Sequence, residues 1–131
     1  MNDFTTELQQ NYPSLFYFRN DSGELLSPAY GIDCPEGWRP LVRRLCAFID
    51  QRNKRGWIVK IAQIKEKFGT LRFYVDGSEP IIEGVIEFAE HLSSLTCEIT
   101  GETGCLCVKD GWYKTLSLDK AKELGFTPVA P

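Results

Sequence analysis

The chain has 131 residues, a hydrophobic fraction of 43% and a formal net charge of −3. A domain of this length buries about two-thirds of its unfolded surface, so its core needs no disulfides, and we expect the cysteines to be reduced. Its apolar runs are far shorter than the roughly 18 residues of a membrane span, and its first residues lack the features of a secretory signal. We therefore expect residues 1–131 to form a single cytoplasmic domain with no membrane contact.

Two helices and a hairpin are predicted in the first part of the chain. Residues 3–12 form a short amphipathic helix, and residues 38–55 carry apolar side chains at three- and four-residue steps. Residues 57–75 alternate in polarity and predict an antiparallel hairpin that turns at Phe68-Gly69. The apolar face of the second helix consists of Trp38, Leu41, Leu45, Phe48 and Ile49.

The second part of the chain adds a long helix, a hairpin and a short last helix. Residues 80–95 begin with a proline and carry an apolar stripe. A hairpin over residues 104–116 turns at residues 109–111, and residues 118–124 form a helix closed by Gly125. The stripe consists of Ile81, Val85, Phe88, Leu92 and Leu95. We expect an α+β fold in which a small antiparallel sheet of two hairpins packs with two longer helices and short terminal helices.

Charge is strongly partitioned along the chain. Residues 39–72 hold ten basic and two acidic residues, net +8, whereas residues 73–108 hold seven acidic residues and no Lys or Arg. One interpretation is that the two segments face each other in the fold. The other is that one face of the molecule is acidic and suits a basic partner.

The acidic residues of the 80–95 helix form a stripe of their own. Like charges four residues apart destabilise a helix slightly unless a cation lies opposite them. This stripe is therefore our candidate partner-binding surface, together with acidic residues at both ends of the helix. The candidate residues are Asp76, Glu79, Glu83, Glu87, Glu90 and Glu98.

Residues 97–120 resemble a zinc knuckle that has lost most of its ligands. Cys97 begins a Cys-x-x-Cys-Gly pattern, but Thr100 replaces the second thiol, and Ser117 and Lys120 stand where further ligands would be. Structural zinc requires four donors, so we expect no metal and no cofactor. A zinc site built from Cys97, Cys105 and Cys107, with either Cys34 or His91 as fourth ligand, stays an alternative.

Catalytic motifs are missing from the sequence. His91 is the single histidine, and no nucleophile motif, phosphate-binding loop or metallohydrolase motif accompanies it. We therefore expect neither an enzyme nor a small-molecule substrate. Nucleic-acid binding is an alternative role for a basic cluster, although a pI near 5.2 argues against it. The cluster consists of Arg43, Arg44, Arg52, Lys54 and Arg55.

The segment from Gln63 to Tyr74 resembles a motif in a family of small uncharacterised phage and bacterial proteins. Further matches to this family are Gly37-Trp38, Cys97, Gly101, Gly111-Trp112 and Thr115-Leu116. Thr100 and Ser117 depart from the knuckle positions of the family. The resemblance implies a scaffold and no particular activity.

In its size, acidity and lack of catalytic groups, the chain is similar to immunity proteins encoded beside Rhs-type polymorphic toxins. This resemblance implies a cognate protein toxin as partner, with an ADP-ribosyltransferase or a nuclease as the toxin. Such enzymes present a cationic cleft, which a rigid acidic helix could occupy. We expect the acidic stripe to block the active-site cleft of the toxin.

Overall fold

The computed structural model describes residues 3–19, 21–26, 31–56, 58–77 and 79–129. It confirms the α+β class. The helices are α1 (Asp3–Asn11), α2 (Pro13–Phe16), the 3-10 turn η1 (Glu36–Trp38), α3 (Arg39–Asn53), α4 (Pro80–Ser93) and α5 (Leu118–Leu124). The strands are β1 (Phe18–Arg19), β2 (Leu25–Leu26), β3 (Gly31–Ile32), β4 (Lys60–Lys67), β5 (Thr70–Asp76), β6 (Cys105–Lys109), β7 (Trp112–Leu116) and β8 (Thr127–Pro128).

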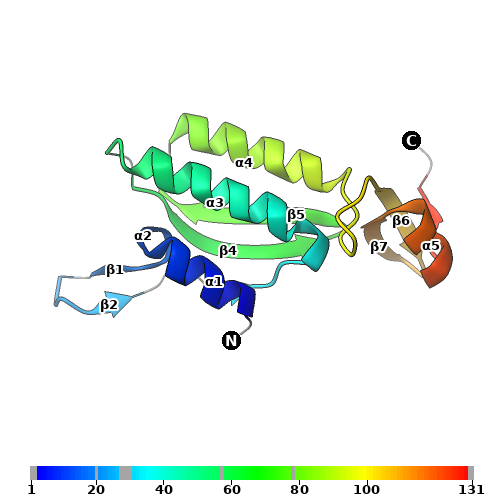
Figure 1. Ribbon diagram of the computed structural model, residues 1–131, viewed down its shortest axis with the longest axis horizontal. Helices are drawn as coiled ribbons and strands as arrows, with labels where there is room; N and C mark the ends of the chain where they lie inside the picture. Colours follow the sequence, from blue (N-terminus) through cyan, green and yellow to red (C-terminus); the bar gives the residue numbers. More distant parts are fainter. Residues whose placement is uncertain (1–2, 20, 27–30, 57, 78, 130–131) are drawn as a thin grey trace.

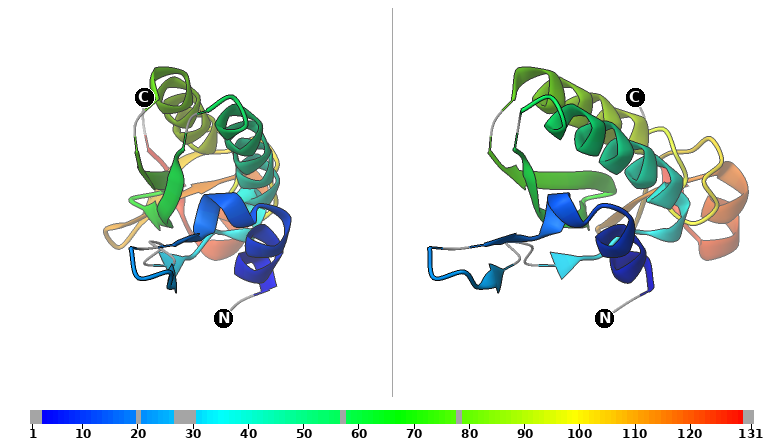
Figure 2. Two further views of the ribbon diagram at one scale, coloured as in Figure 1. Left: turned by 90° about the vertical axis from the view of Figure 1, so that its left-hand side faces the viewer. Right: turned by 60° about the vertical axis from the view of Figure 1, so that its left-hand side comes forward.

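The main sheet has the order β3-β4-β5 and is built on the predicted hairpin. β4 and β5 are antiparallel and turn at Phe68-Gly69, whereas β3 joins β4 in parallel. Trp57, at the predicted start of the hairpin, lies outside the described residues. α3 and α4 run side by side in opposite directions over this sheet (Figure 1), and α1 lies beside α3 (Figure 2). The main core fills the space between these helices and the sheet.

The two hairpins do not share one sheet as predicted, because the second hairpin belongs to a separate sheet with the order β7-β6-β8. This sheet and α5 lie at one end of the long axis of the molecule (Figure 1). A small second core of Cys97, Cys107, Leu116 and Ala121 holds them together. The predicted last helix is confirmed, and Gly125 ends it in the left-handed conformation with a φ of 78°.

The predicted apolar stripe of α4 is not its main buried face, although Val85 packs against the core. The side chains that reach the core are Ile82, Ile86, Ala89 and Ser93, one position away from the predicted stripe. Of that stripe, Ile81, Phe88 and Leu95 are exposed. The helix is turned so that a polar flank meets the outer edge of β5, where a strand needs hydrogen-bond partners.

Two side chains of α4 satisfy this edge. The backbone N–H of Leu71 donates to Ser93 Oγ over 2.9 Å, and the backbone N–H of Phe73 donates to Glu90 Oε2 over 2.9 Å. An unpaired buried N–H group costs about 1–3 kcal/mol. These two bonds therefore fix the rotation of α4, which leaves its second apolar stripe on the surface.

Candidate functional site

Both long hairpins end in the same tight turn. Phe68 and Gly69 have φ angles of 53° and 83°, and Asp110 and Gly111 have φ angles of 50° and 81°. A two-residue turn of this kind requires a left-handed conformation at both positions, which Asp and Gly accept readily. Phenylalanine does not, and the conformation costs roughly 1–2 kcal/mol for an ordinary residue. Phe68 is therefore held in a strained position at the tip of the main sheet.

Three hydrogen bonds hold this strained turn. The backbone N–H of Gly69 donates to Glu66 Oε2 over 2.6 Å, and the Thr70 hydroxyl donates to the carbonyl oxygen of Lys67 over 3.0 Å. The buried hydroxyl of Thr115 donates to the carbonyl oxygen of Gly69 over 2.6 Å. The tip of the β4–β5 hairpin is thereby docked against β7 of the second sheet.

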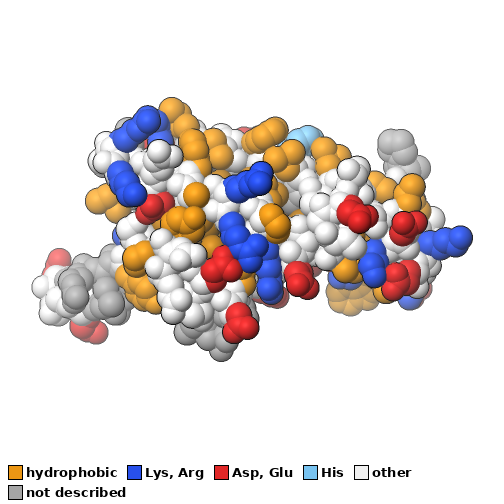
Figure 3. All heavy atoms as spheres, in the orientation of Figure 1, with side chains coloured by type: hydrophobic (Ala, Val, Ile, Leu, Met, Phe, Trp, Pro, Cys, Tyr) orange, Lys and Arg blue, Asp and Glu red, His pale blue; other side chains and the backbone are white. Residues whose placement is uncertain are grey.

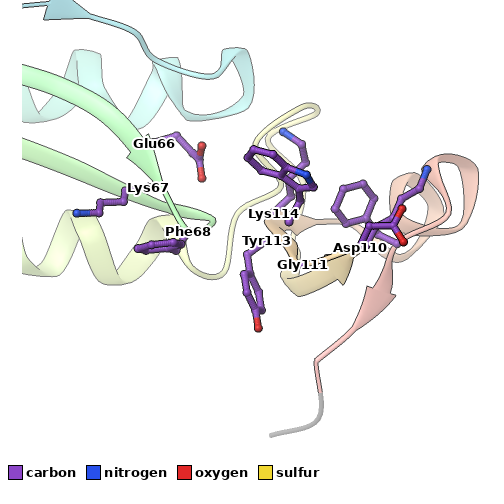
Figure 4. Close-up of a pocket in the computed structure, with 10 residues that line it drawn as sticks. Glu66, Lys67, Phe68, Asp110, Gly111, Tyr113 and Lys114 are labelled. Carbon is purple, nitrogen blue, oxygen red and sulfur yellow. The ribbon is translucent and has the colours of Figure 1, made fainter.

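A recess of about 880 Å³ lies where the two sheets meet. Figure 4 shows Glu66, Lys67 and Phe68 on one side of it, and Tyr113 with the Asp110-Gly111 turn on the other. We call this recess the aromatic site. Its full lining consists of Glu66, Lys67, Phe68, Lys109, Asp110, Gly111, Trp112, Tyr113, Lys114 and Phe126.

The aromatic side chains of this site are unusually accessible. Phe68 is 66% exposed, Trp112 is 75% exposed and Tyr113 is 40% exposed. Large aromatic side chains in contact with water are unfavourable, and at protein interfaces such residues supply much of the binding energy. The charged residues around them carry both signs, so the site does not have the uniformly basic surface typical of nucleic-acid binding.

One lining residue of the site, Lys114, forms an ion pair with the buried Glu98. Lys114 Nζ lies 2.9 Å from Glu98 Oε1, and the backbone N–H of Thr115 donates to Glu98 Oε2 over 3.3 Å. Burial raises the pKa of Glu98, and its bonds with Lys114 and Thr115 offset part of this rise. The bond with Glu98 raises the pKa of Lys114. Glu98 is 4% exposed and holds β7 in place. The prediction that it belongs to an acidic surface is therefore wrong.

Glu79 is the second correction to the predicted acidic surface. It is 2% exposed, caps α4 by accepting the backbone N–H of Ile81, and pairs with Arg52 over 2.8 Å. The hydrogen bond from Arg52 holds the pKa of Glu79 below its ordinary value. The cation that the acidic stripe needs is therefore supplied in part by α3 of the same molecule.

The four other candidate acids divide into two groups. Glu90 is half-buried and bonded to the edge of β5, so it is committed to the fold. Asp76, Glu83 and Glu87 are exposed, Asp76 at the end of β5 and the other two on α4. Three of the six predicted residues are therefore exposed on the surface.

The basic cluster is also partly neutralised. Arg43 makes a two-pronged contact with Glu7 at 2.6 and 3.0 Å, and Lys54 lies 3.5 Å from Asp50. Arg52 is paired with Glu79, as described above. Arg44 is exposed on α3, and Arg55 is exposed in the turn that follows this helix. These pairings favour the interpretation that much of the charge partition is resolved within the fold.

The degenerate knuckle keeps the shape of its turn. The backbone N–H of Thr100 donates to Cys97 Sγ at 3.5 Å, and Gly101 donates to the carbonyl oxygen of Cys97 at 2.9 Å. Burial raises the pKa of Cys97, but hydrogen bonds from Thr100, Ser117 and Ile99 outweigh it and lower the pKa to about 7. The turn therefore still stabilises a thiolate, as a metal-binding knuckle would.

The alternative zinc site is not assembled. Cys105 Sγ and Cys107 Sγ lie 4.0 Å apart, but Cys34 belongs to the main core and His91 is exposed on α4. In the described part of the chain, no group of three or more His, Cys, Asp or Glu side chains is placed to hold a metal ion. Burial raises the pKa of Cys107 to about 11, which disfavours its thiolate form.

Comparisons with protein-family models, with curated proteins and with solved structures found no match to this chain. Among the described residues there is no helix with both the length and the apolar character needed to cross a bilayer. The aromatic site was not predicted from the sequence, although Phe68 lies in a predicted turn and Trp112 lies in a motif of the resembled family. The signal was the residue pair Phe68-Gly69, because the first position of such a turn normally holds Asn, Asp or Gly.

Proposed function

We propose that this protein binds and inhibits another protein, as the cytoplasmic immunity protein of an antibacterial toxin, and performs no catalysis itself. The observation that carries this proposal is Phe68, a strained and mostly exposed aromatic residue in a turn held by three hydrogen bonds, one of them buried. Backbone strain that the surroundings maintain is concentrated at functional positions. An aromatic side chain presented in this way suits insertion into a pocket of a partner.

The interface that we propose is centred on the aromatic site. Phe68 and Trp112 are its anchors, and the charged residues of both signs at its margin fix the orientation of the partner. Of the predicted acidic surface, Asp76, Glu83 and Glu87 remain accessible. They suit the cationic surroundings of an active site that handles nucleic acid or NAD, so an ADP-ribosyltransferase or a nuclease stays our proposed target.

The test is affinity capture from the cells that produce the protein, followed by a growth assay. Wild type, Trp112→Ser and Ile58→Ser are compared, because Ile58 is 73% exposed but lies outside the aromatic site. We expect wild type and Ile58→Ser to retain one protein that Trp112→Ser loses. That protein, expressed alone, should arrest growth, and co-expression of the wild-type chain should restore it.

Two outcomes would contradict the proposal. One is a captured set of proteins that is the same for all three variants. The other is a captured protein whose toxicity the wild-type chain does not relieve. Retention of nucleic acid with a steep salt dependence, lost in Arg44→Glu, would favour the nucleic-acid alternative instead.

A further inference from the structure

An apolar groove of about 270 Å³ runs between α3 and α4. Leu41 and Phe48 line it from α3, and Val85, Phe88 and Leu92 line it from α4. Hydrophobic side chains gather along these helices in Figure 3, with Lys and Arg side chains among them. This groove lies on the helical layer, away from the residues of the aromatic site.

The groove is part of a wider apolar face. Phe88 is 60% exposed, and Ile81, Leu95 and Phe48 are also exposed. Three of these residues belong to the apolar stripe predicted on the 80–95 helix, so the surface has the composition of a buried face. A contiguous apolar surface of this kind on a soluble protein is typical of an interaction site.

Gly84 gives this face an additional feature. It lies between Ile81 and Phe88 on the same side of α4, because residues three and four apart on a helix are neighbours. Glycine inside a helix is less stable than alanine. A side chain at Gly84 would meet no atom within 4 Å in the described structure, so no internal contact requires a glycine. A second helix that approached α4 closely would require one.

Charge indicates what covers this face. Arg44 is exposed on α3, and Glu87 is exposed on α4. The two helices are antiparallel neighbours, so a two-fold axis along the groove would place α3 of one copy on α4 of the other. The basic helix would then meet the acidic helix twice. The surface is therefore complementary to itself.

We propose that a second copy of this chain covers the α3–α4 face. In this dimer the four helices form an antiparallel bundle, Phe48 and Phe88 are buried at its centre, and α4 approaches the partner at Gly84. Arg44 lies near Glu87 of the partner subunit. The aromatic site stays accessible in both subunits.

The first experiment measures molar mass by light scattering over a range of concentrations. We expect a dimer for wild type and a monomer for Gly84→Leu, whose helix content by circular dichroism should not fall, because leucine is a better helix former than glycine. Ile58→Ser is the matched control and should stay dimeric. A wild-type monomer at every concentration would overturn the proposal and assign the face to a different protein. A dimeric Gly84→Leu would also overturn it.

The second experiment exchanges the charges. Arg44→Glu and Glu87→Arg should each weaken the dimer at least tenfold, because each places like charges together twice in a symmetric interface. A mixture of the two variants should regain a dimer that contains one copy of each, because both of its contacts again join a glutamate to an arginine. A mixture that dimerises no better than the separate variants would overturn the arrangement. Both experiments are independent of the toxin, so they can fail while the proposed function holds.

Discussion

The hydroxyl of Thr115 donates to the carbonyl oxygen of Gly69 across a buried 2.6 Å contact. These residues are 46 positions apart and belong to two different sheets. A methyl group on Gly69 would lie 2.8 Å from Leu106 Cδ1, which shows how closely the two sheets approach at this point. The aromatic site therefore rests on a rigid junction between the sheets.

Replacing Thr115 with valine should lower the free energy of unfolding by about 1–3 kcal/mol. Valine keeps the shape of threonine but leaves the buried carbonyl oxygen of Gly69 without its donor. Urea unfolding measures the change. Thr127→Val is the control, because Thr127 is exposed, and it should alter stability by no more than about 0.5 kcal/mol. Equal stabilities for the two variants would show that the bond contributes nothing.

Replacing Phe68 with asparagine should raise the free energy of unfolding by about 1 kcal/mol while weakening partner binding. Asparagine tolerates the φ of 53° that strains phenylalanine. The change also removes an exposed contact of Lys67 Nζ with the Phe68 ring at 5.7 Å, worth roughly 0.5 kcal/mol. The expected gain of about 1 kcal/mol is the relief of backbone strain after this loss is subtracted. Thermal unfolding measures the effect.

Asp110→Asn is the matched control for Phe68→Asn. Asp110 occupies the same position in the other turn with a φ of 50°, and both Asp and Asn accept this conformation. We expect no gain in stability from it. A Phe68→Asn variant that is less stable than wild type would mean that the phenylalanine ring stabilises the fold more than its backbone strains it.

The locally determined features of the fold are readable from the sequence. Both hairpin turns and the last helix end at glycines with positive φ, and Pro80 begins α4. Each of these depends on the chemistry of a few adjacent residues. The sequence therefore predicts the positions of the long helices and hairpins well.

Features that depend on distant residues are not readable in this way. α4 has apolar residues around more than half of its circumference, and the N–H groups of β5 decide which of them is buried. Glu79 is buried because Arg52, 27 positions earlier, reaches it. The apolar periodicity of α4 contains no information on the N–H groups of β5 or on Arg52. The same limit explains why the aromatic site, which joins two sheets, was not predicted.

The pair Arg52–Glu79 predicts a specific loss of stability in acid. Arg52 depresses the pKa of Glu79 in the folded state, so the pair stabilises the fold above the ordinary carboxyl pKa of about 4.3. That contribution disappears as the pH falls through the lower pKa of the folded state. Glu79→Gln should be less stable than wild type at neutral pH, and the difference should shrink in acid. Unfolding midpoints across pH measure it, and a stability difference that stays the same from neutral pH into acid would contradict this assignment.

We predict that the thiol of Cys97 ionises near neutral pH. Its pKa of about 7 contrasts with that of Cys34, which burial raises to about 12. The thiolate absorbance in the ultraviolet should therefore rise through a step near pH 7 in wild type, and Cys97→Ser should lack this step. Because the pKa is depressed on folding, this thiolate stabilises the fold above the unfolded thiol pKa of about 8.5, and the contribution is lost as the pH falls through the folded value.

The hydroxyl of Thr100 provides the decisive comparison for this thiolate. It is the strongest of the hydrogen-bonding groups that lower the pKa of Cys97. Thr100→Val removes the hydroxyl but keeps the backbone N–H that donates to Cys97 Sγ at 3.5 Å. The absorbance step should move to higher pH in this variant, whereas Thr103→Val, an exposed change just after the turn, should leave it in place. A step that does not move in Thr100→Val would show that backbone donors alone hold the thiolate, and a step that survives in Cys97→Ser would assign it to another cysteine.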